Sequence, residues 1–120
     1  MLLVDDDADV LVMLQAVLTS RTLDVVGLAT NGEDAERVAC AIAPDVAVVD
    51  YMMPGLTGFE TAARIKAVRP QCTVVIFSAA ADLEHEALAQ SDVDYFVAKG
   101  SLLDLDTLLN DMRAARNAID

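Results

Sequence analysis

The sequence predicts an α/β protein with a doubly wound, five-stranded parallel sheet and five helices. Short apolar runs alternate with longer stretches of helical period from one end of the 120-residue chain to the other. No linker, low-complexity tract or close sequence repeat interrupts this alternation. The runs at residues 46–49 and 74–77 are apolar at every position, which is typical of parallel strands covered by helices on both faces.

The first strand and helix are expected within the first twenty residues. The apolar run at residues 1–4 predicts a strand, and residues 8–20 have helical period. Either Asp6 or Asp7 is expected to cap this helix, because a short acidic side chain accepts the free amide protons of a first turn. Six residues form its apolar side: Val10, Leu11, Met13, Leu14, Val17 and Leu18.

The next unit begins with a strand at residues 24–28. Thr30 and Asn31 open the helix that follows, and Pro44 ends it because proline lacks the amide proton that a continuing helix needs. The apolar positions of this helix recur at helical spacing: Ala35, Val38, Ala39 and Ile42. A third strand at residues 45–49 is apolar on both faces after its first residue, which places it centrally in the sheet.

The second half of the chain repeats this pattern. Its expected elements are a loop at residues 51–58, a helix at 59–68, a strand at 73–77, a weaker alanine-rich helix at 83–90, a strand at 95–98 and a helix at 103–118. Proline and glycine in the loop favour a turn, and Pro70 closes the helix before it. Right-handed crossovers then give one sheet, which binds ligands at the carboxyl ends of its strands.

Composition and charge exclude several classes of function. Eight Lys plus Arg against twenty Asp plus Glu give a formal net charge of −12. This charge repels phosphate backbones and anionic lipids, so we expect no direct contact with nucleic acid or membrane. No apolar run reaches the roughly 18 residues of a membrane span, and no secretory signal is visible, which favours a cytoplasmic protein. Cys40 and Cys72 have no companion ligands, and we expect both to be small buried residues.

Polar side chains stand at the carboxyl ends of four predicted strands. Asp5 and Asp6 follow the first strand and Asp50 the third, while Ser78 follows the fourth and Lys99 the fifth. Three carboxylates held close together repel one another unless a cation lies among them or a proton is taken up. Oxygen ligands with open positions suit Mg²⁺. The sequence therefore predicts a magnesium site at this edge of the sheet.

Asp50 is the candidate nucleophile at this edge. A carboxylate beside Mg²⁺ and a lysine is arranged to attack phosphorus and form an aspartyl phosphate. The metal ion and Lys99 would offset charge on the oxygens of the transferring group, and the Ser78 hydroxyl would hydrogen-bond one of them. The predicted chemistry is phosphoryl transfer that depends largely on positioning.

Four segments carry a resemblance to a known family: LLVDDD at residues 2–7, DYMMPGLTG at 50–58, IFSA at 76–79 and YFVAKG at 95–100. They resemble, in order, an acidic pair after a first strand, a phosphoacceptor strand end with its loop, a Ser/Thr position, and an aromatic residue with a lysine. Over residues 1–120 the chain is similar to the receiver domain of two-component response regulators. The resemblance implies the flavodoxin-like fold with strand order 2-1-3-4-5.

The resemblance also implies a phosphoacceptor site. Asp50 would accept the phosphoryl group and would share Mg²⁺ with Asp5, Asp6 and the backbone carbonyl of Met52. The donor would be a phosphohistidine on a sensor histidine kinase or on a phosphotransfer protein. The domain would catalyse its own phosphorylation and its own slower dephosphorylation, as a signalling module and not as an enzyme.

A switch is implied as well. Lys99 would bond the phosphoryl group, Ser78 would be drawn toward it, and Phe96 would change rotamer in response. The fourth helix, fifth strand and fifth helix would then present a changed surface to an effector domain or to a second copy. Gly100 stands where many family members have proline, an ending similar to that of receivers attached to helix-turn-helix transcription factors. Such an input module and a stand-alone receiver are both open.

Two other classes of function compete with a phosphorylated receiver. A pseudo-receiver would act only as a protein-interaction module, but no expected site residue is missing from this sequence. An enzyme on the same sheet is the other class. A flavin carrier needs a hydroxyl- and amide-rich loop where this chain has three carboxylates. A phosphatase of the aspartate type would carry a second acid where Met52 stands.

Overall fold

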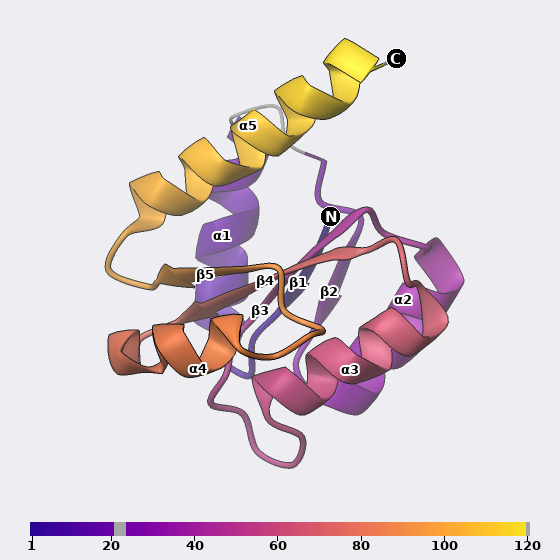
Figure 1. Cartoon of the computed structure of the whole chain (residues 1–120), viewed down its shortest axis with the longest axis vertical. Coiled ribbons are helices and arrows are strands. Elements are labelled where there is room, and N and C mark those ends of the chain that lie inside the picture. The colour runs from indigo at the N-terminus through magenta and orange to yellow at the C-terminus, as the bar shows by residue number, and fades with distance from the viewer. Residues whose placement is uncertain (21–23, 120) are drawn as a thin grey trace.

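Strands and helices alternate along the whole chain in the computed structural model, which describes residues 1–20 and 24–119. The elements are β1 (Leu2–Val4), α1 (Ala8–Ser20), β2 (Gly27–Ala29), α2 (Gly32–Ile42), β3 (Val46–Val49), α3 (Gly58–Val68), β4 (Thr73–Ser78), α4 (Glu84–Leu88), β5 (Tyr95–Ala98) and α5 (Leu102–Ile119). The five strands pair in parallel in the order β2-β1-β3-β4-β5 (Figure 1). The predicted doubly wound, flavodoxin-like fold is confirmed.

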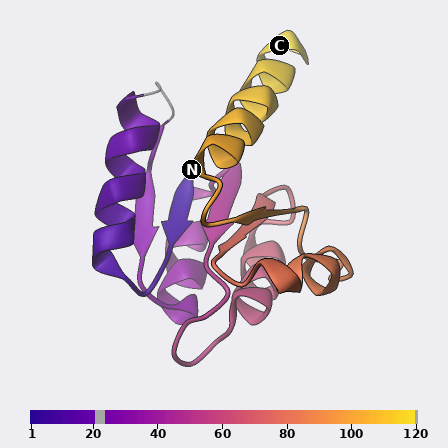
Figure 2. The ribbon, with the colours of Figure 1, turned by 90° about the vertical axis from the view of Figure 1, so that its left-hand side faces the viewer.

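Alternate residues of the strands pack against two different layers of helices. Leu2 and Val4 of β1 belong to the core formed with α2, α3 and α4, whereas Leu3 belongs to the core formed with α1 and α5. Figure 2 shows α1 on one side of the strands and α4 on the other. Because both faces are covered, β3 is apolar throughout and β4 is apolar between Thr73 and Ser78, and this is why the sequence predicted them well.

The register of the sheet brings the ends of the strands to one edge. Ser78, the last residue of β4, lies level with Ala98, the last residue of β5. Backbone bonding continues one residue beyond the strands, since the Asp50 N–H donates to the Val4 carbonyl at 2.9 Å and the Lys99 N–H donates to the Ser78 carbonyl at 2.8 Å. The polar residues that follow the strands are therefore held by the sheet itself.

β2 and α4 differ from their predicted bounds. The strand expected at residues 24–28 starts only at Gly27; before it the Val26 N–H donates to the Met1 carbonyl and the Met1 ammonium donates to the Asp24 carbonyl. The helix expected at residues 83–90 is shorter and follows a 3-10 turn. Leu83, at its start, provides no capping side chain. Both elements lie in segments where the apolar pattern is weak, so their ends are set by backbone bonding.

Short polar side chains begin α1, α2 and α3. Asp7, one of the two predicted caps of α1, accepts the Asp9 N–H at 2.9 Å, and Asn31 caps α2. α3 begins with a capping box in which Thr57 Oγ1 accepts the Glu60 N–H and the Glu60 carboxylate accepts the Thr57 N–H. The spacing of Thr57 and Glu60 is the sequence signal for this box, and our sequence analysis missed it.

The two cysteines have different surroundings. Cys72 is buried, as predicted, and burial raises the pKa of its thiol to about 11. The prediction for Cys40 is wrong, because this residue is exposed on α2 directly after the buried Ala39. Helical spacing in an alanine-rich segment does not separate the inner from the outer side sharply, since alanine is tolerated on both.

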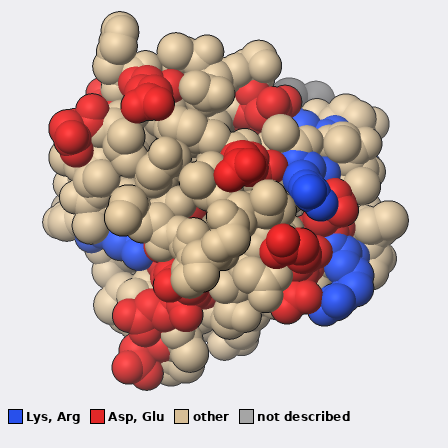
Figure 3. All heavy atoms as spheres, turned by 90° about the horizontal axis from the view of Figure 1, so that it is seen from below, with Lys and Arg blue, Asp and Glu red and all other residues tan. Residues whose placement is uncertain are grey.

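Acidic side chains are spread over the surface, whereas basic side chains gather mainly beside α2 and α3 in the view from below (Figure 3). Basic residues on these helices are paired: Arg37 lies 2.6 Å from Asp34, and Arg64 lies 3.8 Å from Glu36. Because these basic side chains pair with acidic ones, the excess of negative charge lies on the rest of the surface. Within residues 1–20 and 24–119, we find no helix with the length and apolar character needed to cross a bilayer.

Gly58, the first residue of α3, lies against the backbone that carries Asp50. A Cβ atom at Gly58 would come within 2.6 Å of the Asp50 carbonyl oxygen and 2.7 Å of the Tyr51 Cα. Because both are backbone atoms, Gly58→Ala is expected to lower the free energy of unfolding by about 1–3 kcal/mol, measured by urea denaturation. Gly100→Ala is the control, since its Cβ would meet nothing within 4 Å, and its effect should stay within about 0.5 kcal/mol. Equal stability of the two variants would contradict this packing argument.

Candidate functional site

One lysine bridges two carboxylates at the edge where the strands end. Asp5 follows β1, Asp50 follows β3 and Lys99 follows β5. The Lys99 Nζ lies 2.7 Å from Asp5 Oδ2 and 3.3 Å from Asp50 Oδ1. Asp5 and Asp50 meet because β1 and β3 are neighbours in the sheet, whereas β5 lies two positions beyond β3 and the long Lys99 side chain spans that gap.

Three carboxylates crowd together around this ammonium group. Single carboxylate oxygens of Asp5, Asp6 and Asp50 all lie within 4.8 Å of one another. Asp5 and Asp50 are only 2% and 6% exposed, whereas Asp6 is exposed. One ammonium therefore faces three acidic groups, two of them largely removed from water, and the site carries an excess of negative charge.

The pKa values of the site reflect this excess. Burial is the main cause that raises the pKa of the Asp50 carboxyl above its ordinary value, and the charge of Asp5 raises it further, while Lys99 acts in the opposite direction. For Lys99, burial favours the neutral amine. The hydrogen bond to Asp5 and the charges of Asp50 and Asp5 outweigh burial, and the pKa of Lys99 is raised. The site thus favours additional positive charge beside Asp50.

The three carboxylates fit a hard divalent cation. Their oxygens are the donor type that Mg²⁺ prefers, and the exposed Asp6 leaves one side of the cluster open to water. Asp5 already accepts two hydrogen bonds, one from the Asp7 N–H at 2.9 Å and one from the Lys99 ammonium. Asp6 and Asp50 are therefore better placed for direct contact with a metal ion, and Asp5 for contact through water.

Ser78 is fully buried at the end of β4, next to the site. Its Oγ accepts the Ala80 N–H at 3.2 Å, and its carbonyl accepts the Lys99 N–H. Phe96 of β5 is half-buried and packs against the core under α2, α3 and α4. The structure thus connects Ser78 directly to the backbone of Lys99, and Phe96 lies partly exposed against this core.

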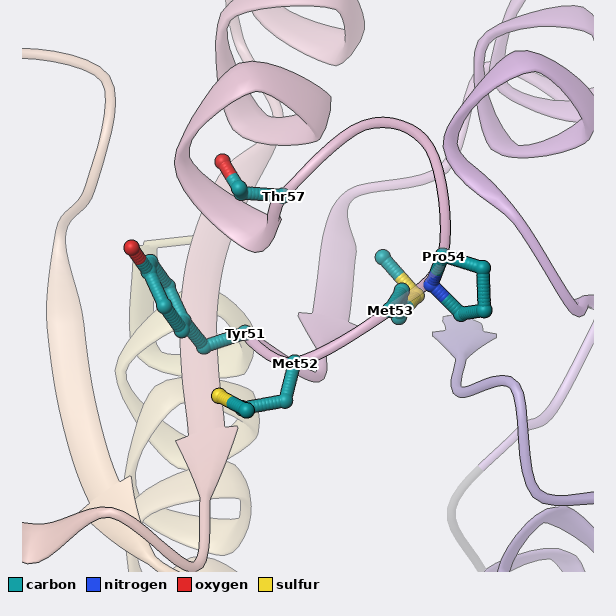
Figure 4. Close-up of a pocket in the computed structure, with 5 residues that line it drawn as sticks. All are labelled: Tyr51, Met52, Met53, Pro54 and Thr57. Atoms are coloured by element: carbon teal, nitrogen blue, oxygen red, sulfur yellow. The ribbon is translucent and has the colours of Figure 1, made fainter.

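The loop after β3 forms an apolar pocket beside Asp50. The pocket has a volume of about 390 Å³ and is lined by Tyr51, Met52, Met53, Pro54 and Thr57 (Figure 4). The Met52 side chain is 67% exposed, whereas Met53 is buried. Tyr51 meets the Phe59 ring edge-on with 4.6 Å between centroids. No spacing in the sequence indicates this ring contact, because it depends on how the loop folds back onto α3.

A family model described as the response regulator receiver domain matches residues 1–113. The chain belongs to the response regulator receiver family. The match covers every element that supplies a residue to the site, from β1 to β5, and most of α5. The prediction from the four sequence segments is therefore confirmed at the level of the family.

Individual relatives agree with this assignment. The protein-glutamate methylesterase/protein-glutamine glutaminase of Halalkalibacterium halodurans is 33% identical over 109 residues, which are 88% of this chain and 32% of that protein. The chemotaxis protein CheY of Thermotoga maritima is 32% identical over 78 residues, 65% of each chain. The receiver thus spans about a third of the length of such methylesterases.

Solved structures show the same architecture. The response regulator domain of Thermotoga maritima CheB superimposes with a TM-score of 0.79 at 29% identity, covering 97% of this chain and 94% of that one. The N-terminal domain of an uncharacterized protein from Wolinella succinogenes gives a TM-score of 0.81 at 32% identity, covering 99% and 96%. The chain is thus a receiver domain similar to those of CheY and CheB, a signalling module of two-component systems.

Proposed function

We propose that this receiver accepts a phosphoryl group on the carboxylate of Asp50, with Mg²⁺ bound beside it. The observation that carries the proposal is the bridging of Asp5 and Asp50 by the Lys99 ammonium within a cluster of three carboxylates. A buried carboxylate, a fixed cation and a set of hard oxygen ligands are the parts that phosphoryl transfer to an aspartate requires. The donor is a phosphohistidine on a sensor histidine kinase or on a phosphotransfer protein.

The transfer of the phosphoryl group to Asp50 forms one bond to phosphorus and breaks another. One Asp50 oxygen bonds to phosphorus while the bond from phosphorus to the donor imidazole nitrogen breaks, and the imidazole leaves with that electron pair. The Lys99 ammonium donates to a phosphoryl oxygen. Asp5, Asp6, Asp50 and the Met52 carbonyl are the proposed holders of Mg²⁺, which supplies further charge neutralisation at the phosphoryl oxygens.

The proposed output is a shift of the α4, β5 and α5 surface. The Ser78 Oγ accepts the Ala80 N–H at 3.2 Å, so its own hydroxyl proton can be donated to a phosphoryl oxygen, and Phe96 follows as a rotamer change. Large apolar side chains on this surface, Leu88, Tyr95 and Leu103, are exposed and available to a partner. That partner is an effector domain, such as that of a helix-turn-helix transcription factor, or a second copy of the chain.

Incubation with acetyl phosphate and Mg²⁺, followed by intact-mass measurement, tests the proposal. We expect the mass of one phosphoryl group to be added to the wild type, and none to Asp50→Asn, because the amide is a poor nucleophile. Omission of Mg²⁺ should prevent the addition. A pseudo-receiver would give no adduct in either protein, and an adduct of equal amount on Asp50→Asn would place the phosphoryl group elsewhere. Either result would overturn the proposal.

A further inference from the structure

The side chain of Asp94, the residue before β5, accepts a hydrogen bond from the backbone of β4 at a position that the paired strand residues do not reach. Val74 is fully buried near the start of β4, and its carbonyl accepts the Asp94 N–H at 2.9 Å. Its N–H donates to Asp94 Oδ2 at 2.8 Å. The ladder between the two strands begins one residue later, where Val75 lies level with Tyr95. A buried N–H needs an acceptor, and the carboxylate stands where a further residue of β5 would otherwise provide one.

The same carboxylate oxygen also binds α3. The Lys66 Nζ lies 2.8 Å from Asp94 Oδ2, so one oxygen accepts from a side chain of α3 and from the backbone of β4. Both bonds are charge-assisted, and the one to Val74 ends on a buried group. Asp94 therefore ties together three elements that come from separate parts of the chain: α3, β4 and the start of β5.

The opposite end of β5 carries Lys99. There the Lys99 N–H donates to the Ser78 carbonyl, and β5 between the two ends is the four-residue strand Tyr95–Ala98 at the edge of the sheet. A strand this short has few backbone bonds with which to fix its register. A slip by one residue would turn each side chain to the other face and would move the Lys99 ammonium away from the carboxylates.

We propose that Asp94 is a positioning residue, which fixes the register of β5 on β4 and so holds Lys99 within reach of Asp5 and Asp50. The inference deepens the proposed function, on which its activity readout rests. In this proposal the bond from the Val74 N–H to the Asp94 carboxylate fixes the register of β5. The ion pair between Asp94 and Lys66 contributes less, because that pair is partly exposed.

Three substitutions separate the two bonds of the Asp94 carboxylate. Asp94→Ala removes both, Asp94→Asn keeps an oxygen for the Val74 N–H but loses the charge that Lys66 meets, and Lys66→Met removes the ion pair alone. We expect Asp94→Ala to slow the phosphorylation of Asp50 by acetyl phosphate about tenfold or more, because misplacement of a catalytic group is costly. The other two should stay within about threefold of the wild type. Slowing by Lys66→Met equal to that by Asp94→Ala would overturn the proposal.

A double variant distinguishes positioning from general weakening of the fold. If Asp94 acts through Lys99, then Asp94→Ala combined with Lys99→Ala should be phosphorylated at the rate of Lys99→Ala alone. A merely structural role would slow the double variant by the same factor again, and that result would contradict the inference. Urea denaturation establishes that each variant is folded under the conditions of the assay.

Amide hydrogen exchange tests the register without any phosphorylation. In Asp94→Ala the Lys99 N–H should lose protection, while the Asp50 N–H, which is bonded to the Val4 carbonyl, should keep it. If Asp94→Ala does not fold, Asp94→Glu is used in its place. The longer side chain keeps the charge that pairs with Lys66 but moves the carboxylate oxygen away from the Val74 N–H. Unchanged protection of Lys99 overturns the inference. If the wild type takes up no phosphoryl group while Asp94→Ala still shows this loss of protection at Lys99, the proposed function alone is overturned.

Discussion

Replacement of Lys99 by alanine is expected to slow the phosphorylation of Asp50 by about 100-fold or more. The ammonium group is the fixed donor nearest to the carboxylate oxygens, and removal of one such donor to developing charge costs about 10²–10³ in rate. Loss of Lys99 also removes the influence that lowers the pKa of the Asp50 carboxyl, so this pKa is expected to rise further above its ordinary value. The initial rate of mass gain with acetyl phosphate, at saturating Mg²⁺, measures the effect.

Arg37→Ala is the matched control for this substitution. It removes the same charge, but the Arg37 side chain is 75% exposed and pairs with Asp34 on the same helix. We expect a rate within about twofold of the wild type, because exposed pairs contribute little. Lys99→Ala also leaves the buried Asp5 carboxylate without its positively charged partner, at a cost of about 2 kcal/mol in the free energy of unfolding. A wild-type rate for folded Lys99→Ala would refute the proposed role of the ammonium.

Mg²⁺ is expected to stabilise the wild type by about 2.7 kcal/mol when its concentration is a hundred times the dissociation constant. The physical reason is the repulsion among the three carboxylates, which a bound cation relieves in the folded protein and not in the unfolded chain. Urea denaturation with and without MgCl₂ measures the difference. In Asp5→Asn combined with Asp6→Asn, most of this stabilisation should be lost.

A second pair of substitutions controls for net charge. Asp104 and Asp111 are exposed on α5, and their replacement by asparagine removes the same two charges away from the cluster. This control variant should keep the stabilisation by Mg²⁺ seen in the wild type. Equal responses of the two double variants to MgCl₂ would mean that the ion acts through general screening and not through the site.

The apolar pattern predicts the centre of this fold better than its margins. β3 is apolar at every position and β4 is apolar between Thr73 and Ser78, so no other assignment competes for them, and α3 between them follows from spacing and proline. β2 lies at the edge of the sheet and α4 is short, and there backbone bonding decides the ends. Cys40 shows the same limit within α2, because its alanine neighbours do not reveal which side faces water.

The position of the candidate site could be predicted from the topology of the sheet, but the contacts among its side chains could not. Once the strands are parallel, Asp5, Asp50 and Lys99 must meet at one edge, whatever their separation in the sequence. That Lys99 lies nearer to Asp5 than to Asp50 depends on side-chain rotamers and burial, which no spacing encodes. The bond from Val74 to Asp94 was missed for a similar reason, since a carboxylate that replaces a strand partner resembles an ordinary loop residue in the sequence.

The close approach of Gly58 to the Asp50 backbone has a mechanical consequence. With 2.6 Å between the position that a Cβ atom would take at Gly58 and the Asp50 carbonyl oxygen, the start of α3 packs directly against the backbone of Asp50. If Asp50 accepts a phosphoryl group as we propose, its backbone cannot move toward α3 in response, because a residue without a side chain already allows the closest approach there.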